Sequence, residues 1–122
     1  MLIKELKPNE IFVFGSNEAG RHGRGAAFTA KKWGARYGIG VGLSGQTYAI
    51  PTKDRNIKTL PLRKIKEYVE TFLEFAKSKP ELTFLVTNIG CGLAGYKESD
   101  IAPMFKNSTD NVILSQEFMK LL

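Results

Sequence analysis

The chain has 122 residues, 43% of them hydrophobic, which is enough for one domain with its own core. It contains no apolar run near the roughly 18 to 20 residues of a membrane span, and residues 1–10 lack the apolar centre of a signal peptide. With one cysteine, Cys91, and one histidine, His22, an internal disulfide and a Cys/His metal cluster are both excluded by number. We therefore expect a cytoplasmic, monomeric protein that uses no metal and no cofactor.

The net charge of +6 is unevenly distributed along the chain. Residues 1–66 hold 13 lysines and arginines against 4 acidic residues, a net +9, whereas residues 67–122 hold 5 against 8, a net −3. A basic half suits a polyanionic partner such as a nucleotide or a nucleic acid. A solvated basic surface without a partner is the alternative, and charge alone does not separate the two.

The first part of the chain predicts a strand, a glycine-rich loop and a helix in succession. Ile11–Phe14 is an apolar run typical of a buried strand, and the segment GSNEAGRHGRGAA follows it directly. The residues from Ala26 to about Tyr37 favour a helix that ends at Gly34 or Gly38. The glycine content of residues 38–45 predicts a mobile loop without regular structure.

The middle of the chain predicts a short strand and a long helix. Tyr48–Ile50 is the strand, and it ends at Pro51, Thr52 and Lys53. The helix begins at Leu62, because apolar residues recur from there at i, i+3, i+4 and i+7 as far as Ala76. Lys79-Pro80 closes it.

The stretch Thr83–Tyr96 is the centre of the pattern. Its apolar, β-branched run Phe84–Thr87 predicts a strand buried on both faces. The next residues are Gly90-Cys91-Gly92-Leu93-Ala94-Gly95, and three glycines in six residues allow close approach to a ligand. A strand, a glycine loop and then a helix bring backbone N–H groups together around an anion, usually a phosphate. A tight turn without a ligand gives the same pattern.

A helix near Asp100–Phe105, a strand at Val112–Leu114 and a last segment capped by Ser115 complete the chain. Alternating strands and helices predict an α/β fold with helices on both faces of one sheet, as a single domain over residues 1–122. In such sheets ligands bind beyond the carboxyl ends of the strands. Three segments follow strands directly and should converge there on a phosphate-containing ligand: Gly15–Gly25, Pro51–Arg55 and Gly90–Tyr96.

Lys53 is the candidate for chemistry at that edge. A lysine there neutralises a phosphate, acts as an acid or, when neutral, attacks a sugar carbon. An ordinary surface lysine is the alternative. Cys91 stands between two glycines and is interpreted as a small loop residue rather than a nucleophile. Neither a P-loop nor a dinucleotide-binding glycine pattern is complete in the chain.

Aromatic and acidic residues near these segments have structural explanations as well as functional ones. Tyr48 and Tyr96 are either core-edge residues or groups that stack on a ligand. The acidic residues nearest the predicted site are Asp54, Glu98 and Asp100. The last two fit better as first-turn helix acids, where a carboxylate is favourable.

Two segments, GSNEAGRHGRGAAFTAKKWGA and TNIGCGLAGY, resemble the first ligand loop and the diphosphate loop of macro domains, and the likeness spans about Ile11 to Phe105. The order YAIPTKDR, helix and IGCGLAGYKESDIAPMF is similar to one branch of that family. That branch contains the DarG-type antitoxins, which remove ADP-ribose from DNA, and the terminal ADP-ribose protein glycohydrolases. The resemblance implies a three-layer α/β/α domain with a mixed sheet.

The resemblance also implies an ADP-ribose ligand. Lys53, after Thr52, matches the catalytic lysine of the branch and would attack or polarise the anomeric carbon at which ADP-ribose joins its acceptor. The distal ribose would be approached by Gly23, Gly25 and Ala26, with Asn17 nearby. The diphosphate would be held through backbone amides by the loop made of Gly90, Cys91, Gly92, Leu93, Ala94, Gly95 and Tyr96.

Ala94 stands where the protein glycohydrolases carry an acidic residue, and the DarG pattern has no acid there either. The nucleic-acid branch is therefore the closer fit. We expect an ADP-ribosyl glycohydrolase that acts on nucleic acid or protein with Lys53 as the catalytic residue. The alternatives are a module that binds ADP-ribose or a related NAD-derived nucleotide without turnover, and an ADP-ribose phosphoester phosphatase. Phe118 is a candidate for stacking on adenine.

Overall fold

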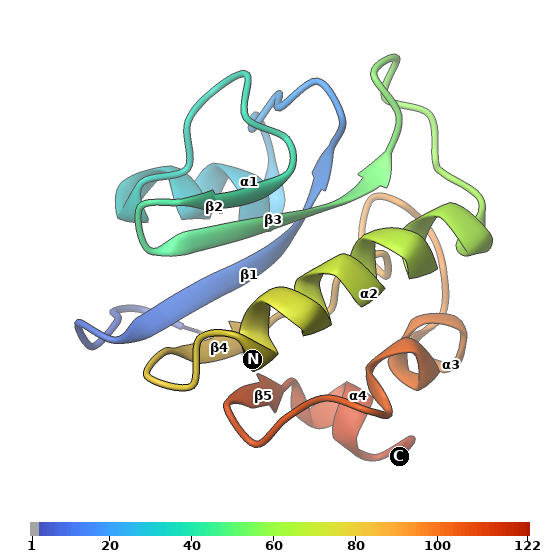
Figure 1. The fold of residues 1–122 in the computed structure, drawn as a ribbon. Coiled ribbons are helices and arrows are strands. Elements are labelled where there is room, and N and C mark those ends of the chain that lie inside the picture. Colours follow the sequence, from blue (N-terminus) through green and yellow to red (C-terminus); the bar gives the residue numbers. More distant parts are fainter. Residues whose placement is uncertain (1–2) are drawn as a thin grey trace.

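The computed structural model describes residues 3–122, and within them the chain forms a five-stranded mixed sheet with helices (Figure 1). The strand order is β2-β3-β1-β4-β5; β2 is antiparallel to β3 and all other neighbours are parallel. The α/β class expected from the sequence is therefore confirmed. The elements in chain order are β1 (Glu10–Asn17), α1 (Gly25–Ala30), η1 (Lys31–Trp33), β2 (Gly42–Ser44), β3 (Thr47–Lys53), α2 (Leu62–Lys77), β4 (Thr83–Val86), α3 (Glu98–Ile101), η2 (Ala102–Phe105), β5 (Val112–Leu114) and α4 (Gln116–Met119).

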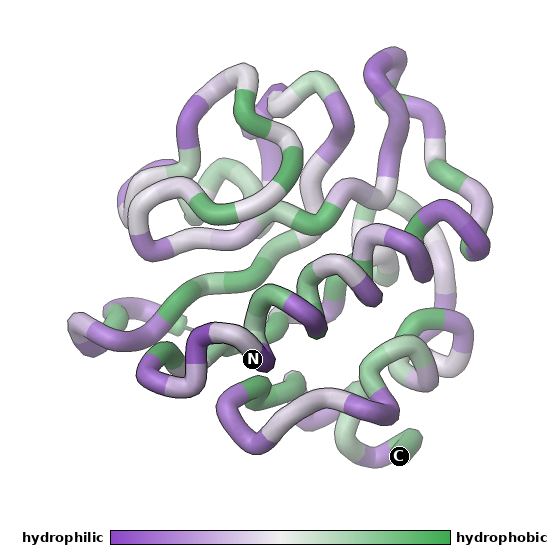
Figure 2. The backbone as a smooth tube through the Cα atoms, viewed as in Figure 1, coloured by the Kyte–Doolittle hydropathy of each residue, from purple (hydrophilic) through white to green (hydrophobic). Residues whose placement is uncertain are grey.

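Strand β1 lies in the middle of the sheet and both of its faces are buried. Ile11 and Val13 belong to the larger hydrophobic cluster, together with residues of α2. Phe12 and Phe14 belong to the smaller cluster on the other face, with residues of α1. Because successive strand side chains point to opposite faces, helices on both faces explain why this strand is a continuous apolar run. In Figure 2 the hydrophobic residues follow β1 through the middle of the fold.

Helix α2 packs across the sheet as its periodicity predicts. Ile65, Val69, Phe72 and Ala76 are its buried residues, and all four belong to the larger cluster. Polar residues occupy the outward side of the helix, so its stability comes from this one apolar face. Within residues 3–122, no helix combines the length and the apolar character that crossing a membrane requires.

Phe118 also belongs to the larger cluster. Its side chain is fully buried and stacks on Phe105 with ring centroids 5.8 Å apart. The prediction that Phe118 stacks on adenine is therefore wrong. The reason is that α4, whose first turn is capped by Ser115, directs this ring inward against η2.

Two predictions for residues 26–45 need correction. The helix expected from Ala26 to Tyr37 is much shorter, because α1 gives way to the 3₁₀ turn η1 and then stops at Gly34, whose φ is 114°. Residues 38–45 are not without regular structure. They include β2, which forms a hairpin with β3 through a turn in which Gly45 has a φ of 57°.

Strand β4 is buried on one face only, which corrects the expectation that both faces are covered. Phe84 and Val86 are fully buried in the larger cluster, while Leu85 between them is half-buried. On the neighbouring strand β5, Ile113 is 41% exposed. The smaller cluster takes its strand residues from β1 and β3, so α1 covers that part of the face and leaves β4 and β5 less protected.

Candidate functional site

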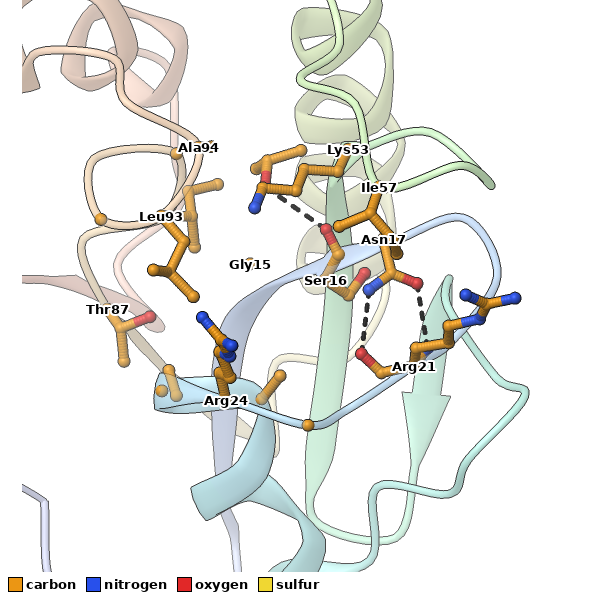
Figure 3. A pocket seen from close by; sticks show the side chains of 18 of the residues that line it. Gly15, Ser16, Asn17, Arg21, Arg24, Lys53, Ile57, Thr87, Leu93 and Ala94 are labelled. Atoms are coloured by element: carbon orange, nitrogen blue, oxygen red, sulfur yellow. Dashed lines mark hydrogen bonds between the residues drawn. The ribbon is translucent and has the colours of Figure 1, made fainter.

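A cavity of about 550 Å³ opens beyond the carboxyl ends of β1, β3 and β4 (Figure 3). This volume lies within the roughly 300–1,000 Å³ usual for small-molecule sites. Three loops follow these strands and surround the cavity: the first loop (residues 18–24), the second loop (54–61) and the third loop (87–97). The lining residues are Gly15, Ser16, Asn17, Arg21, Gly23, Arg24, Gly25, Ala26, Ala27, Thr52, Lys53, Ile57, Thr87, Asn88, Ile89, Gly90, Gly92, Leu93 and Ala94.

Most residues proposed from the sequence as site residues meet at this cavity. Those that line it are Asn17, Gly23, Gly25, Ala26, Thr52, Lys53, Gly90, Gly92, Leu93 and Ala94. Cys91, Gly95 and Tyr96 do not line it. The convergence of three strand-end segments is therefore present, and the binding of a ligand there stays a prediction.

The third loop, which lines the cavity, has backbone hydrogen-bond donors that the protein itself leaves unpaired. The carbonyl oxygens of Gly90, Gly92 and Ala94 each accept a bond from within the protein, at 2.9–3.1 Å. Within residues 3–122, no hydrogen bond is formed by the backbone N–H of these three residues or of Leu93 between them. All four residues line the cavity. Unpaired N–H groups around a concavity are the arrangement that binds anions in backbone nests.

Cys91 lies in the same loop but packs against the larger core cluster. Its Sγ is 3.4 Å from the carbonyl oxygen of Ile89. Burial, and then the nearby carboxylates of Glu98 and Asp100, raise the pKa of the thiol to about 11. The side chain is therefore a neutral thiol near pH 7, which agrees with its interpretation as a loop residue and not a nucleophile.

Tyr96 and Gly95 shape the third loop without lining the cavity. The Tyr96 hydroxyl donates to the carbonyl oxygen of Leu60 at 2.6 Å, and its ring packs against the larger cluster. Gly95 has a φ of 89°, which only glycine adopts readily, and it closes the turn that Gly92 begins. Tyr48 is buried in the core, where burial raises the pKa of its hydroxyl. Neither tyrosine is placed to stack on a ligand in the cavity.

The first loop is held rigidly at its base. The side chain of Asn17 forms two hydrogen bonds with the backbone of Arg21, one to its carbonyl oxygen and one from its N–H, both at 2.9 Å (Figure 3). Asn17 lines the cavity, but its amide group is occupied with bracing the loop. The two arginines of the loop, Arg21 and Arg24, are exposed and line the cavity.

Residues 38–40 support the first loop from outside. A Cβ atom on Gly20 would lie 2.4 Å from the Gly38 carbonyl carbon, so the two backbones are in direct contact. The Ser16 hydroxyl donates to the Gly40 carbonyl oxygen. His22 is buried, and its Nε2 lies 3.0 Å from the carbonyl oxygen of Ile39. The histidine is thus a structural residue of this contact and not the base of a catalytic triad.

A β-bulge positions Lys53. Ser16 of β1 pairs with Pro51 of β3, but Asn17 pairs with Lys53, so Thr52 is an extra residue on β3. In a regular strand, neighbouring side chains point to opposite faces. The bulge removes that constraint, and Thr52 and Lys53 both line the cavity. The Thr52 hydroxyl donates to the Ser16 carbonyl oxygen at 3.3 Å and fixes the bulge.

The second loop uses its acidic residue internally. Asp54 Oδ1 accepts hydrogen bonds from the backbone N–H groups of Asn56 and Lys58, at 2.8 and 3.0 Å. Ile57 lies at the rim of the cavity with a φ of 63°, a strained angle for a β-branched residue. Strain of this kind is found mostly at functional sites. The aspartate shapes this loop and does not line the cavity.

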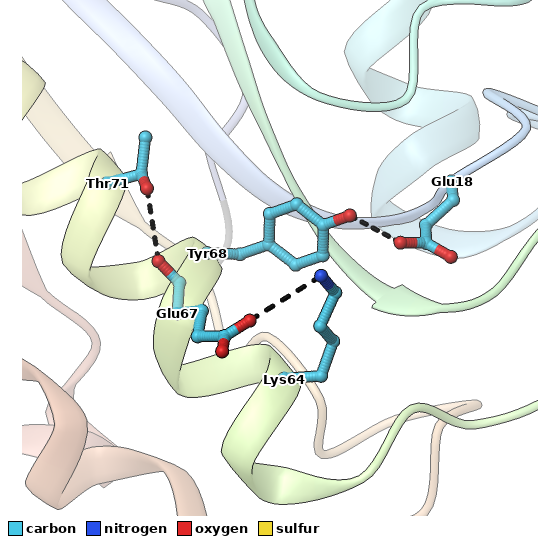
Figure 4. Close-up of polar contacts among 5 residues, drawn as sticks. All are labelled: Glu18, Lys64, Glu67, Tyr68 and Thr71. Atoms are coloured by element: carbon cyan, nitrogen blue, oxygen red, sulfur yellow. Dashed lines mark hydrogen bonds and ion pairs between the residues drawn. The ribbon is translucent and has the colours of Figure 1, made fainter.

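Glu18 connects the first loop to both β3 and α2. Its backbone N–H donates to the carbonyl oxygen of Lys53 at 2.9 Å, and its carboxylate accepts a hydrogen bond from the Tyr68 hydroxyl (Figure 4). Burial, and then the hydrogen bond with Glu18, raise the pKa of Tyr68 to about 12. Lys64 lies 5.2 Å from the centre of the Tyr68 ring and 3.5 Å from Glu67. This contact anchors the backbone on which Lys53 sits to the long helix.

The charge of the cavity has a single sign. Arg21, Arg24 and Lys53 line it, and within residues 3–122 no carboxylate does. In Figure 3 the Arg24 side chain points up into the space below Leu93, and Lys53 enters from the opposite side near Ala94. A concave site with cations and unpaired N–H groups attracts an anionic ligand.

Sequence reasoning did not single out nine of the lining residues: Gly15, Ser16, Arg21, Arg24, Ala27, Ile57, Thr87, Asn88 and Ile89. The arginines lay inside a predicted loop, and their charge was a signal that could have been used. Thr87 and Asn88 directly precede the third-loop glycines. The positive φ of Ile57 could not be predicted from the residue pattern.

Among residues 3–122, no group of three or more His, Cys, Asp or Glu side chains is arranged to hold a metal ion. Comparison of the chain with models of known protein families, with curated proteins and with solved structures finds no match.

Proposed function

We propose that this chain is a macro-type α/β/α domain that binds ADP-ribose in the cavity and hydrolyses the bond between ADP-ribose and an acceptor. The observation that carries the proposal is the row of unpaired N–H groups at Gly90, Gly92, Leu93 and Ala94. A diphosphate supplies the acceptor oxygens that these donors lack. The positive charge from Arg21, Arg24 and Lys53 supports the same ligand.

Lys53 is the proposed catalytic residue. Among the described lining residues it is the only one with an amine, a group that can give a proton as an ammonium or act as a nucleophile when neutral. As an ammonium group it can give a proton to the departing acceptor atom while water adds to the anomeric carbon. As a neutral amine it can attack that carbon and displace the acceptor, which takes up the proton that the amine loses; water then hydrolyses the covalent intermediate and returns free lysine and ADP-ribose. The bulge at Thr52 supports either role, because it lets Lys53 reach the cavity.

Nucleic acid is the acceptor that we place first. Residues 1–66, which provide two of the three loops, carry a net charge of +9. The exposed cations around the cavity mouth would then contact the phosphates next to the modified nucleotide. Protein is the alternative acceptor, and the test below compares the two.

The test is the release of ADP-ribose from a labelled DNA oligonucleotide and from a labelled protein. Lys53→Ala is expected to lower turnover by at least about 100-fold, the scale of a lost proton-transfer group. Its affinity for free ADP-ribose should fall by about tenfold or less, the scale of one charged hydrogen bond. Lys58→Ala is the matched control, because Lys58 is exposed in the second loop and does not line the cavity. Equal turnover by both variants would contradict the role of Lys53.

A module that binds ADP-ribose without turnover is the second candidate. It is favoured by the absence of any carboxylate among the lining residues within 3–122 and by the neutral thiol of Cys91. Lys53 would then act only by charge. Binding of free ADP-ribose without release from either substrate would support this function over hydrolysis. Absence of binding would contradict both.

A further inference from the structure

We infer that the cavity recognises the diphosphate of its ligand but not the identity of the base, so that nucleoside diphosphate riboses with different bases bind alike. This inference rests on the proposed function. It follows from a comparison of the polar groups that the cavity offers with those that the fold already uses. A base is identified by hydrogen bonds to its edge, and such bonds need groups that are free to make them.

The neutral polar side chains at the β1 and β3 ends are occupied. Both polar atoms of the Asn17 amide are bonded to the Arg21 backbone. The Ser16 and Thr52 hydroxyls donate to backbone carbonyl oxygens, and both residues are at least 95% buried. What remains on these side chains is the acceptor lone pairs of the hydroxyls and part of the Asn17 amide, and with all three residues at most 8% exposed they offer a base little polar surface.

The polar side chains after β4 are occupied in the same way. The Thr87 hydroxyl donates to the Val13 carbonyl oxygen at 2.9 Å, and the Asn88 amide nitrogen donates to Glu117 at 3.2 Å. The Asn88 Oδ1 atom has no partner, but it is shielded from solvent within the described structure. A base in the cavity would therefore not reach it.

The groups that remain free are of two kinds. The first are donors, namely the three cations and the N–H groups of the third loop, and these match phosphate oxygens. The second are apolar side chains at the rim, Leu93 at 64% and Ile57 at 38% exposure. An apolar surface contacts the flat face of any base and does not distinguish one from another. Among the described lining residues the exocyclic amino group of adenine finds no well-exposed side-chain acceptor, because Thr87 is half-buried and Asn17, Ser16 and Thr52 are at most 8% exposed.

The experiment compares binding of three ligands to the full chain by calorimetry: ADP-ribose, its hypoxanthine analogue inosine diphosphate ribose, and its pyrimidine analogue cytidine diphosphate ribose. The hypoxanthine analogue replaces the amino donor of adenine by a carbonyl acceptor and changes little else. We expect the three dissociation constants to agree within about threefold, which is under 1 kcal/mol at a tenfold change per 1.4 kcal/mol. Gly92→Val should abolish binding of all three together.

Asn88→Ala provides a second readout. If a base contacted Asn88, this variant would weaken the binding of ADP-ribose more than the binding of the hypoxanthine analogue. We expect instead that the affinities for the two ligands change equally. A preference of tenfold or more for one base would overturn the inference while leaving the proposed function in place. Failure of all three ligands to bind would instead overturn the proposed function, and the inference with it.

Discussion

The first and third loops are both rich in glycine and both line the cavity, but glycine serves different purposes at the base of the first loop and at Gly92 of the third. Around the first loop, glycine permits backbones to touch: a Cβ on Gly40 would lie 2.2 Å from the Asn17 carbonyl oxygen. In the third loop, a Cβ on Gly92 would meet no atom within 4 Å, because it would point into open space beside the cavity. A count of glycines does not separate these two cases. What the missing side chain would have met decides whether the glycine serves packing or a ligand.

The two loops also differ in what they bring to a ligand. The first loop contributes charge, through Arg21 and Arg24, on a backbone held by the Asn17 side chain. The third loop contributes geometry, through unpaired N–H groups. Its backbone is held in place because the carbonyl oxygens of Gly90, Gly92 and Ala94 accept hydrogen bonds from within the protein. Charge attracts an anion over a distance that salt screens, whereas fixed donors recognise its shape. Substitutions in each loop can separate the two contributions.

The largest effect is expected from Gly92→Val in the third loop. The valine side chain would occupy the space next to the unpaired N–H groups, so we expect ADP-ribose affinity to fall by more than about 100-fold, or 2.8 kcal/mol. The backbone φ at Gly92 is outside the left-handed region, and nothing crowds the site. The midpoint of thermal unfolding should therefore stay within about 2 °C. Unchanged affinity in this folded variant would remove the third loop from the binding site.

The opposite pattern is expected from Gly20→Ala in the first loop. Its φ of 74° and the 2.4 Å approach to the Gly38 carbonyl carbon make any side chain costly, and we expect a loss of about 2–4 kcal/mol in unfolding free energy. Gly23→Ala is the matched control, since that position is open and has an ordinary φ. Denaturant unfolding of both variants gives the comparison. Similar midpoints would show that residues 38–40 do not support the first loop.

A smaller effect is expected from Arg24→Gln. Loss of one cation inside the cavity should weaken ADP-ribose binding by about tenfold at low salt, near 1.4 kcal/mol. The difference from the unmodified protein should shrink as salt is added, because screening removes the lost attraction. Arg36→Gln makes the same change in net charge at an exposed position that does not line the cavity. Binding titrations at several salt concentrations should leave this control close to the unmodified protein, and an equal loss in both variants would mean that only overall charge matters.

The smallest effect is expected from Tyr68→Phe. The variant removes the hydrogen bond that joins α2 to Glu18 and keeps the ring in place. We expect a loss of about 1 kcal/mol in unfolding free energy and a change in ADP-ribose affinity of about threefold or less. Hydrogen exchange at the Glu18 N–H, which bonds to Lys53, reports the local loosening directly. No change in that exchange rate would mean that the contact does not hold the first loop.

The sequence predicts the parts of the fold that local pattern controls. The spacing of Ile65, Val69 and Phe72 identifies α2, because apolar residues that recur every three or four positions lie on one face of a helix. The apolar runs of β1 and β5 are equally direct. Strand β2 was missed, because its three residues are stabilised by the hairpin with β3 and not by their own propensity.

The location of the cavity could be predicted from one rule, which is that the loops after parallel strands meet at the same edge of the sheet. That rule brings Asn17, Lys53 and Gly90 together without any knowledge of contacts. It does not say which way an aromatic ring turns, and so it could not distinguish Tyr96 and Phe118, which serve the core, from residues that face a ligand. The bulge at Thr52 and the contact between Glu18 and Tyr68 join residues distant in the chain and leave no local signal.

The central position of β1 has a consequence for the order of events during folding. Its two neighbours in the sheet come from far along the chain: Phe12 pairs with Thr47 and Glu10 pairs with Thr83. Contacts between such distant segments form slowly, while a helix such as α2 forms early from neighbouring residues. The cavity needs both pairings, so the ligand binding that we propose would be acquired at the end of folding. In a refolding experiment the return of the proposed binding would mark completion of the sheet, and a chain still emerging from the ribosome would lack the cavity until the third loop has been made.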